Sequence, residues 1–146
     1  MKIRAGFVSN SSSSSFIVVG LKTDYDYSDY EYNLSSGVCE FGWGPERLFD
    51  ITSRINWVMV LAKTEEDFNL IERVLKSVLK KKQYKKDFNF FKDRLLNHDG
   101  KLNDYTYAYI DHQSKCDTEN LFKDENKMKA FIFNEDSFIQ LDNDNY

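Results

Sequence analysis

The segment that begins at Thr64 most constrains the fold, because it predicts a helix with a defined first residue. Thr64 is followed by Glu65, Glu66 and Asp67. A threonine with a carboxylate three residues later is typical of a capping box, and acidic side chains favour the positive end of the helix dipole. Apolar residues then recur at the spacing of one helix face, at Phe68, Ile71, Leu75, Val78 and Leu79.

A second apolar stripe follows the first, at Tyr84, Phe88, Phe91 and Leu95. At about 100° per residue it lies roughly half a turn around the helix from the first stripe. Two interpretations remain open across Thr64–Asn97: one long helix with partners on opposite sides, or two helices separated near Lys82–Lys86. The displaced stripe favours two helices, the second ending at Gly100.

Composition places this segment in a single α+β domain. The chain has 146 residues, of which 16% are aromatic and 30% charged, with a net charge of −4. A ring-rich core offsets the charged content, and a mildly acidic protein is unsuited to nonspecific binding of nucleic acid or anionic membrane. Two isolated cysteines, Cys39 and Cys116, fit a reducing compartment better than a disulfide framework. We therefore expect a cytoplasmic protein without a membrane segment.

Strand signals flank the helical segment on both sides. Apolar or alternating runs predict strands at Phe16–Leu21, Ile55–Ala62 and Tyr105–Ile110, and a terminal hairpin from Ala130–Asn134 and Ser137–Leu141. A short helix is expected from Pro45 through Phe49, and a weak one over Thr118–Lys127. Together these predict a mixed or antiparallel sheet of four to six strands, with two or three helices packed mainly on one face.

The N-terminal region 1–15 contains five consecutive serines, Ser11 to Ser15, and predicts a flexible leader ahead of a domain spanning 16–146. Its residues from Gly6 to Phe16, Gly-Phe-Val-Ser-Asn-Ser-Ser-Ser-Ser-Ser-Phe, closely resemble a leader found at the start of many otherwise dissimilar proteins of bacteriophages and their bacterial hosts. The resemblance covers under a tenth of the chain. It implies a phage or prophage origin and no particular activity.

Acids and rings alternate in the segment Asp24–Tyr32, with tyrosines at Tyr25, Tyr27, Tyr30 and Tyr32 and aspartates at Asp26 and Asp29 among them. Alternation of period two predicts a strand with one wet face, and the phase slip at Ser28 predicts a bulge or turn. Rigid tyrosine rings beside carboxylates are suited to contacting a basic surface of another protein. A strand that simply buries half of its tyrosines is the alternative interpretation.

One further cluster suggests chemistry. Asp111, His112 and Ser114 follow the strand predicted at Tyr105–Ile110, where a histidine could act as a general base. Asp142 and Asp144 near the C-terminus could add hard oxygen ligands for Mg²⁺ or Mn²⁺. A solvated acidic tail and a loop histidine are the stronger interpretation.

Basic residues crowd between Lys76 and Arg94 and could follow a phosphate backbone, with Tyr84 or Phe88 stacking on bases. Because both rings belong to a predicted core stripe, a solvated helix face is favoured over a nucleic-acid site.

Two hypotheses follow. The first is a non-enzymatic, phage-type accessory protein without a cofactor that binds a host protein, such as a defence component, through the acidic aromatic segment. The second is a small Mg²⁺- or Mn²⁺-dependent hydrolase or nuclease that uses Asp111, His112 and the C-terminal aspartates. The first is favoured.

Overall fold

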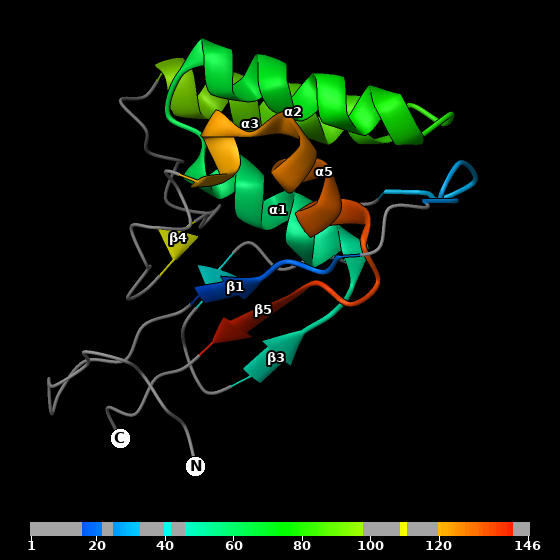
Figure 1. The fold of residues 1–146 in the computed structure, drawn as a ribbon. Helices are drawn as coiled ribbons and strands as arrows, with labels where there is room; N and C mark the ends of the chain where they lie inside the picture. Colours follow the sequence, from blue (N-terminus) through cyan, green and yellow to red (C-terminus); the bar gives the residue numbers. More distant parts are fainter. Residues whose placement is uncertain are drawn as a thin grey trace, which may run out of the picture.

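A buried helix lies at the centre of the molecule, between a small antiparallel sheet and a pair of longer helices (Figure 1). The structure is a computed structural model that describes residues 16–21, 25–32, 40–41, 46–97, 109–110 and 120–141. Residues 120–123 are also helical. The elements in chain order are β1 (Phe16–Val18), β2 (Glu40–Phe41), β3 (Glu46–Leu48), α1 (Ile51–Leu61), α2 (Glu65–Val78), α3 (Tyr84–Asn97), β4 (Tyr109–Ile110), α5 (Glu125–Phe133) and β5 (Phe138–Leu141).

The central helix α1 corrects the strand predicted at Ile55–Ala62. Every residue of α1 is buried, including its four polar residues Thr52, Ser53, Arg54 and Asn56, and the run from Trp57 to Leu61 is apolar throughout. A short run that is apolar on all sides looks the same whether it forms a buried helix or a buried strand. The start of the helix is set by Asp50, whose carboxylate accepts a hydrogen bond from the Ser53 amide at 2.9 Å.

The two-helix interpretation of Thr64–Asn97 is confirmed. The Thr64 hydroxyl accepts from the Asp67 amide at 3.1 Å, and the Asp67 carboxylate accepts from the Thr64 amide at 3.2 Å, which completes the predicted capping box. Helix α2 ends at Val78, and α3 runs back beside it (Figure 1). The rings of Phe68 and Phe88 meet edge to face across this pair, 5.8 Å apart.

The sheet is smaller than predicted. Its strand order is β1-β5-β3, and all of its pairings are antiparallel. A separate parallel pair joins β2 to β4. The α+β class is confirmed, and the helices lie on one side of the three-stranded sheet (Figure 1). A sheet of four to six strands is not found among the described residues.

Three local predictions change near this sheet. The terminal hairpin is wrong, because Ala130–Phe133 lies in α5 and only its second strand survives, as β5. A cap at Asp124, together with Met128, Phe131 and Ile132 buried at helical spacing, favours the helix. The short helix expected from Pro45 is wrong, because Glu46–Leu48 pairs with β5 as β3. The strand expected at Phe16–Leu21 is shorter, as β1.

Two further predictions are confirmed in part. Of the strand predicted at Tyr105–Ile110, the last two residues form β4, and the others lie outside the described residues. The helix expected over Thr118–Lys127 is interrupted at Asp124, which separates the helical residues 120–123 from α5. The 1–15 leader also lies outside the described part of the chain.

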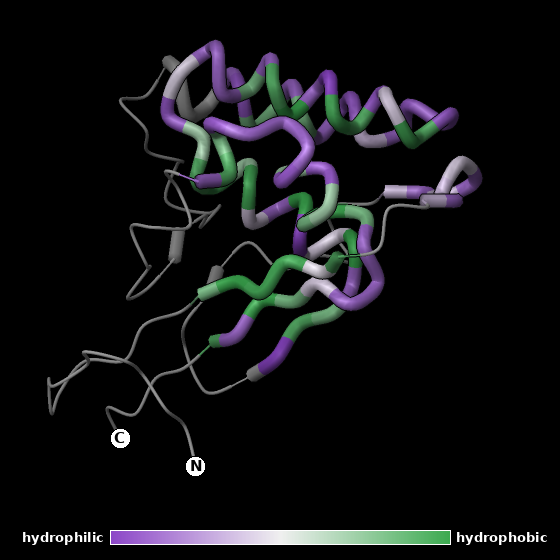
Figure 2. Tube along the Cα trace, viewed as in Figure 1, coloured by the Kyte–Doolittle hydropathy of each residue, from purple (hydrophilic) through white to green (hydrophobic). Residues whose placement is uncertain are grey.

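The core fills the space between the layers with large rings. Its fully buried side chains include Trp57, Phe68, Phe88, Phe91, Phe131 and Phe133. Apolar residues run along β1 and the second half of α1, whereas α2 and α3 alternate between polar and apolar residues (Figure 2). No helix in the described ranges is both long enough and apolar enough to cross a membrane.

Candidate functional site

The acidic aromatic segment, Tyr25–Tyr32, is an irregular chain with a turn rather than a strand. The turn falls at Ser28 and Asp29, where the phase slip predicts it, and the Tyr30 amide donates to the Tyr27 carbonyl at 2.9 Å. The Lys80 amide donates to the Ser28 carbonyl at 3.3 Å, which joins the turn to the loop between α2 and α3. The turn offsets the slip in the alternation, so that all four tyrosines can face the core.

All four tyrosines of this segment are at least partly buried. The hydroxyls of Tyr30 and Tyr32 form hydrogen bonds with Thr52 and Asn56 of α1. Tyr32 is only 4% exposed, and burial is the main cause of the raised pKa of Tyr30. The tyrosines therefore hold the segment against the helix layer.

The ring of Phe133 supports the other two tyrosines. The Tyr27 ring stacks on it at 6.0 Å, and the Tyr25 ring lies tilted at 6.3 Å. Tyr25 also keeps part of its surface exposed, and its pKa is raised by partial burial.

The carboxylates between the tyrosines point away from the core. Asp26, Asp29 and Glu31 are all exposed. Glu31 accepts a salt bridge from Lys81 at 3.0 Å, and this hydrogen bond is the main cause of the raised pKa of Lys81. Among the described residues, Asp26 and Asp29 form no salt bridge. The segment thus presents two exposed carboxylates without a salt bridge among the described residues, and Asp29 is close enough to Lys81 to contribute to its raised pKa.

A buried arginine fixes the turn that follows α5. Arg54 is 1% exposed, and its guanidinium donates to the carbonyls of Asn134 and Ser137, the second at 3.1 Å. Burial lowers the pKa of Arg54. Its Nε–H has no acceptor among the described residues. This guanidinium ties α1 to the turn between α5 and β5.

The same turn holds the chain beyond β1. The Gly20 amide donates to the Ser137 hydroxyl at 2.8 Å, and that hydroxyl donates to the Ala130 carbonyl at 2.9 Å. A Cβ on Gly20 would lie 2.4 Å from the buried Asn134 side chain, so only glycine fits this approach. The residues around Gly20 are thereby held beside α5.

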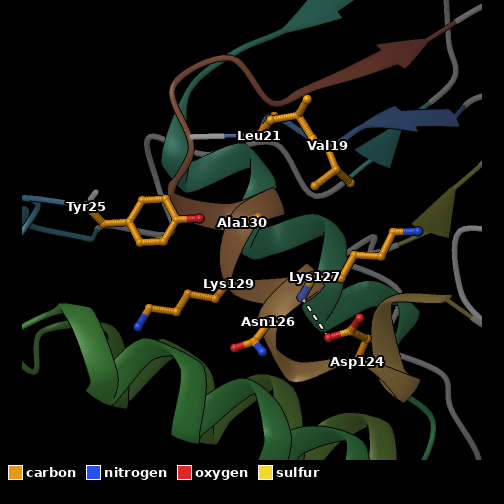
Figure 3. Close-up of a pocket in the computed structure, with 9 residues that line it drawn as sticks. Val19, Leu21, Tyr25, Asp124, Asn126, Lys127, Lys129 and Ala130 are labelled. Atoms are coloured by element: carbon orange, nitrogen blue, oxygen red, sulfur yellow. Dashed lines mark hydrogen bonds between the residues drawn. The ribbon is translucent and has the colours of Figure 1, made fainter. Parts of the chain in front are cut away.

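A groove opens between this held segment and α5 (Figure 3). It has a volume of about 710 Å³, and its lining is mainly apolar, from Val19, Leu21, Tyr25 and Ala130. Lys127 and Lys129 extend from α5 toward opposite sides of it (Figure 3). A concave apolar surface flanked by charge suits a side chain of a ligand or of another protein.

The sequence gives one signal for this groove and misses the rest. An isolated glycine in a strand pattern indicates a close backbone approach, which Gly20 makes. Nothing in the spacing of Leu21, Lys127 and Lys129 predicts that they lie together, because more than 100 residues separate Leu21 from the lysines.

The basic stretch Lys76–Arg94 is partly neutralised by acids. Lys76 pairs with Glu72 at 3.5 Å, Lys81 with Glu31 at 3.0 Å, and Lys92 with Glu65 at 3.9 Å. The two rings suggested for base stacking, Tyr84 and Phe88, are each 1% exposed. The predicted core stripe is therefore confirmed at Tyr84, Phe88 and Phe91, and the first two rings are not available to bases.

The residues of the hydrolase hypothesis lie outside the described part of the chain. This holds for Asp111, His112, Ser114, Asp142 and Asp144. Within the described ranges, no group of three or more His, Cys, Asp or Glu side chains is arranged to hold a metal ion.

Comparisons with known proteins assign no role to this chain, so the proposal below is based on the geometry of the described residues. No protein-family model, curated protein or solved structure matches the chain.

Proposed function

We propose that this chain is a non-enzymatic, phage-type accessory protein that binds a host protein through the outward carboxylates of the segment Tyr25–Tyr32. The observation that carries the proposal is the division of this segment into two sides. Its tyrosines pack on α1 and Phe133, while Asp26 and Asp29 remain exposed and without a salt bridge among the described residues. The phage resemblance of Gly6–Phe16 supports a host protein as the partner.

A fixed backbone makes these carboxylates effective in binding. Ordering a loop on association costs free energy, and a segment already held in place avoids most of that cost. Here the hydrogen bond from Lys80 to Ser28 and the salt bridge from Lys81 to Glu31 hold the outer side of the turn. The carboxylates are therefore presented in one arrangement before a partner arrives.

The chemistry of the segment defines the class of partner. Exposed carboxylates attract a basic surface and accelerate its association, and this effect weakens as salt screens the charges. A basic groove that ordinarily holds nucleic acid is one such surface. We infer that the partner presents lysines or arginines to Asp26 and Asp29.

The structure determines which side chains the test should change. Replacing the tyrosines would remove contacts with α1 and Phe133 and so unfold the segment, whichever function it has. The informative variant is Asp26→Asn/Asp29→Asn. Its matched control is Glu65→Gln/Glu66→Gln at the opposite end of α2 from the turn, which removes the same amount of charge (Figure 1).

The experiment is affinity capture from a lysate of the bacterial host, followed by association kinetics with the captured protein at several salt concentrations. We expect the Asp26→Asn/Asp29→Asn variant to lose capture and to associate at least about tenfold more slowly at low salt. The control variant should behave as the unmodified chain. Equal capture by both variants would remove this surface from the proposal.

A further inference from the structure

The groove beside α5 differs in charge from the acidic turn next to it. Leu21 is 94% exposed, the largest exposure among the exposed large apolar residues in the described ranges. Gly20 holds it in place through the hydrogen bond to Ser137. A leucine fixed in water at the edge of a groove gains most when another apolar group covers it.

The groove continues into a second, smaller hollow of about 200 Å³. The two hollows share Val19 and Lys127, and the second adds Ile17, Asn120 and Leu121. The groove is mainly apolar, whereas the smaller hollow exposes more polar than apolar surface, and one lysine borders both. An extended peptide can fill both hollows with two of its side chains.

Two lysines, Lys127 and Lys129, give the groove a net positive charge. Neither Lys127 nor Lys129 forms a salt bridge with any described residue. Lys129 lies 5.9 Å from the centre of the Tyr25 ring. The lining also contains one carboxylate, Asp124, which accepts from the Lys127 amide at 3.1 Å as the cap of α5, so two positive charges and one negative charge surround the groove. A ligand with carboxylates would complement both lysines.

We propose that this groove binds an acidic peptide segment of a partner protein, with an apolar side chain in the groove, a polar side chain in the smaller hollow and a carboxylate between them on Lys127. Lys129 receives a second carboxylate at the Tyr25 end. The inference rests on the proposed role as a protein-binding module, but it assigns an adjoining surface, which shares Tyr25 with the acidic segment and has the opposite charge preference. The chain then offers carboxylates from its turn and lysines from α5.

The probe is a display library of random 12-residue peptides, selected on the full chain and counter-selected on a Leu21→Ser/Lys127→Glu variant. We expect enrichment of peptides in which Asp or Glu separates one apolar residue from one uncharged polar residue. Peptides without this pattern, peptides rich in Lys or Arg, or a failure to enrich any sequence would each overturn the proposal.

A labelled copy of the enriched peptide then measures affinity by fluorescence anisotropy. Leu21→Ser should weaken binding by about tenfold or more, and Lys127→Ala by about three- to fivefold at low salt. Lys86→Ala, a change at an exposed lysine of α3, should leave affinity unchanged. Equal effects of the Lys127 and Lys86 substitutions would refute the assignment, and thermal unfolding of each variant shows that it is folded.

The Asp26→Asn/Asp29→Asn variant separates the two proposals. It should bind the peptide as tightly as the unmodified chain. If this variant still captures the host protein while Leu21→Ser loses the peptide, the acidic turn is the wrong surface and the groove stands. If no peptide binds while the acidic variant loses capture, the groove is wrong and the turn stands.

Discussion

Replacing Ser137 by alanine tests whether one buried hydroxyl holds the groove together. Ser137 is 0% exposed, and its hydroxyl accepts from the Gly20 amide at 2.8 Å and donates to the Ala130 carbonyl at 2.9 Å. The Ala130 carbonyl keeps a second donor, the Asn134 amide at 3.0 Å. The buried Gly20 amide would have no other hydrogen-bond acceptor among the described residues.

The expected cost follows from these two bonds. A buried amide without an acceptor costs about 1–3 kcal/mol, and a lost hydroxyl bond about 1 kcal/mol. We therefore expect Ser137→Ala to lower the free energy of unfolding by about 2–4 kcal/mol, a large share of the ~5–15 kcal/mol typical of a domain. The affinity of the groove for its peptide should fall as well, because Leu21 is no longer held beside α5.

Urea unfolding, followed by the fluorescence of the buried Trp57, measures this difference. Two other serine-to-alanine changes serve as controls. Ser77 donates only to Val74 of its own helix, at 2.6 Å, so Ser77→Ala should change stability by under about 0.5 kcal/mol. The hydroxyl of Ser53 is buried without a partner among the described residues, so Ser53→Ala should be neutral or stabilising by up to about 1 kcal/mol. If Ser137→Ala lowers the free energy of unfolding by no more than Ser77→Ala does, the hydrogen bonds from Gly20 to Ser137 and from Ser137 to Ala130 do not hold the groove together.

Three further predictions concern the tyrosines and Gly20. Tyr32→Phe should lower the free energy of unfolding in urea by about 1–3 kcal/mol, because it leaves the buried side-chain oxygen of Asn56 without the tyrosine donor. Tyr84→Phe should be neutral or stabilising, because the Tyr84 hydroxyl has no partner among the described residues. Burial, and after it the charge of Glu72, raises the pKa of Tyr84 above 10.0. The stability that protonated Tyr84 contributes is therefore complete below pH 10.0 and is lost as the pH rises through the folded pKa. Tyr84→Phe should lose less stability at high pH than the unmodified chain, and parallel curves of stability against alkaline pH would contradict this. Gly20→Ala should lower the thermal midpoint by more than Gly→Ala changes at open positions do, since its Cβ meets the fixed Asn134 side chain at 2.4 Å, and an unchanged midpoint would show that this approach is not tight.

Local sequence determined the elements whose polar and apolar residues are segregated. The capping box at Thr64 and the displaced stripes of α2 and α3 predict both helices, because each has one wet face that records its period. The turn at Ser28 is likewise predicted by the slip in the tyrosine alternation. These features depend on neighbours a few residues apart.

Tertiary structure alone decided the state of the fully buried segments and the composition of the candidate surfaces. Helix α1 has no wet face, so its sequence carries no period that separates helix from strand, and packing on every side selects the helix. The groove requires Gly20 to approach Asn134 and Ser137, which lie more than 100 residues away in the chain. Which tyrosines turn inward and which charges remain unpaired follows from these long-range contacts, because only the folded chain brings their partners within reach.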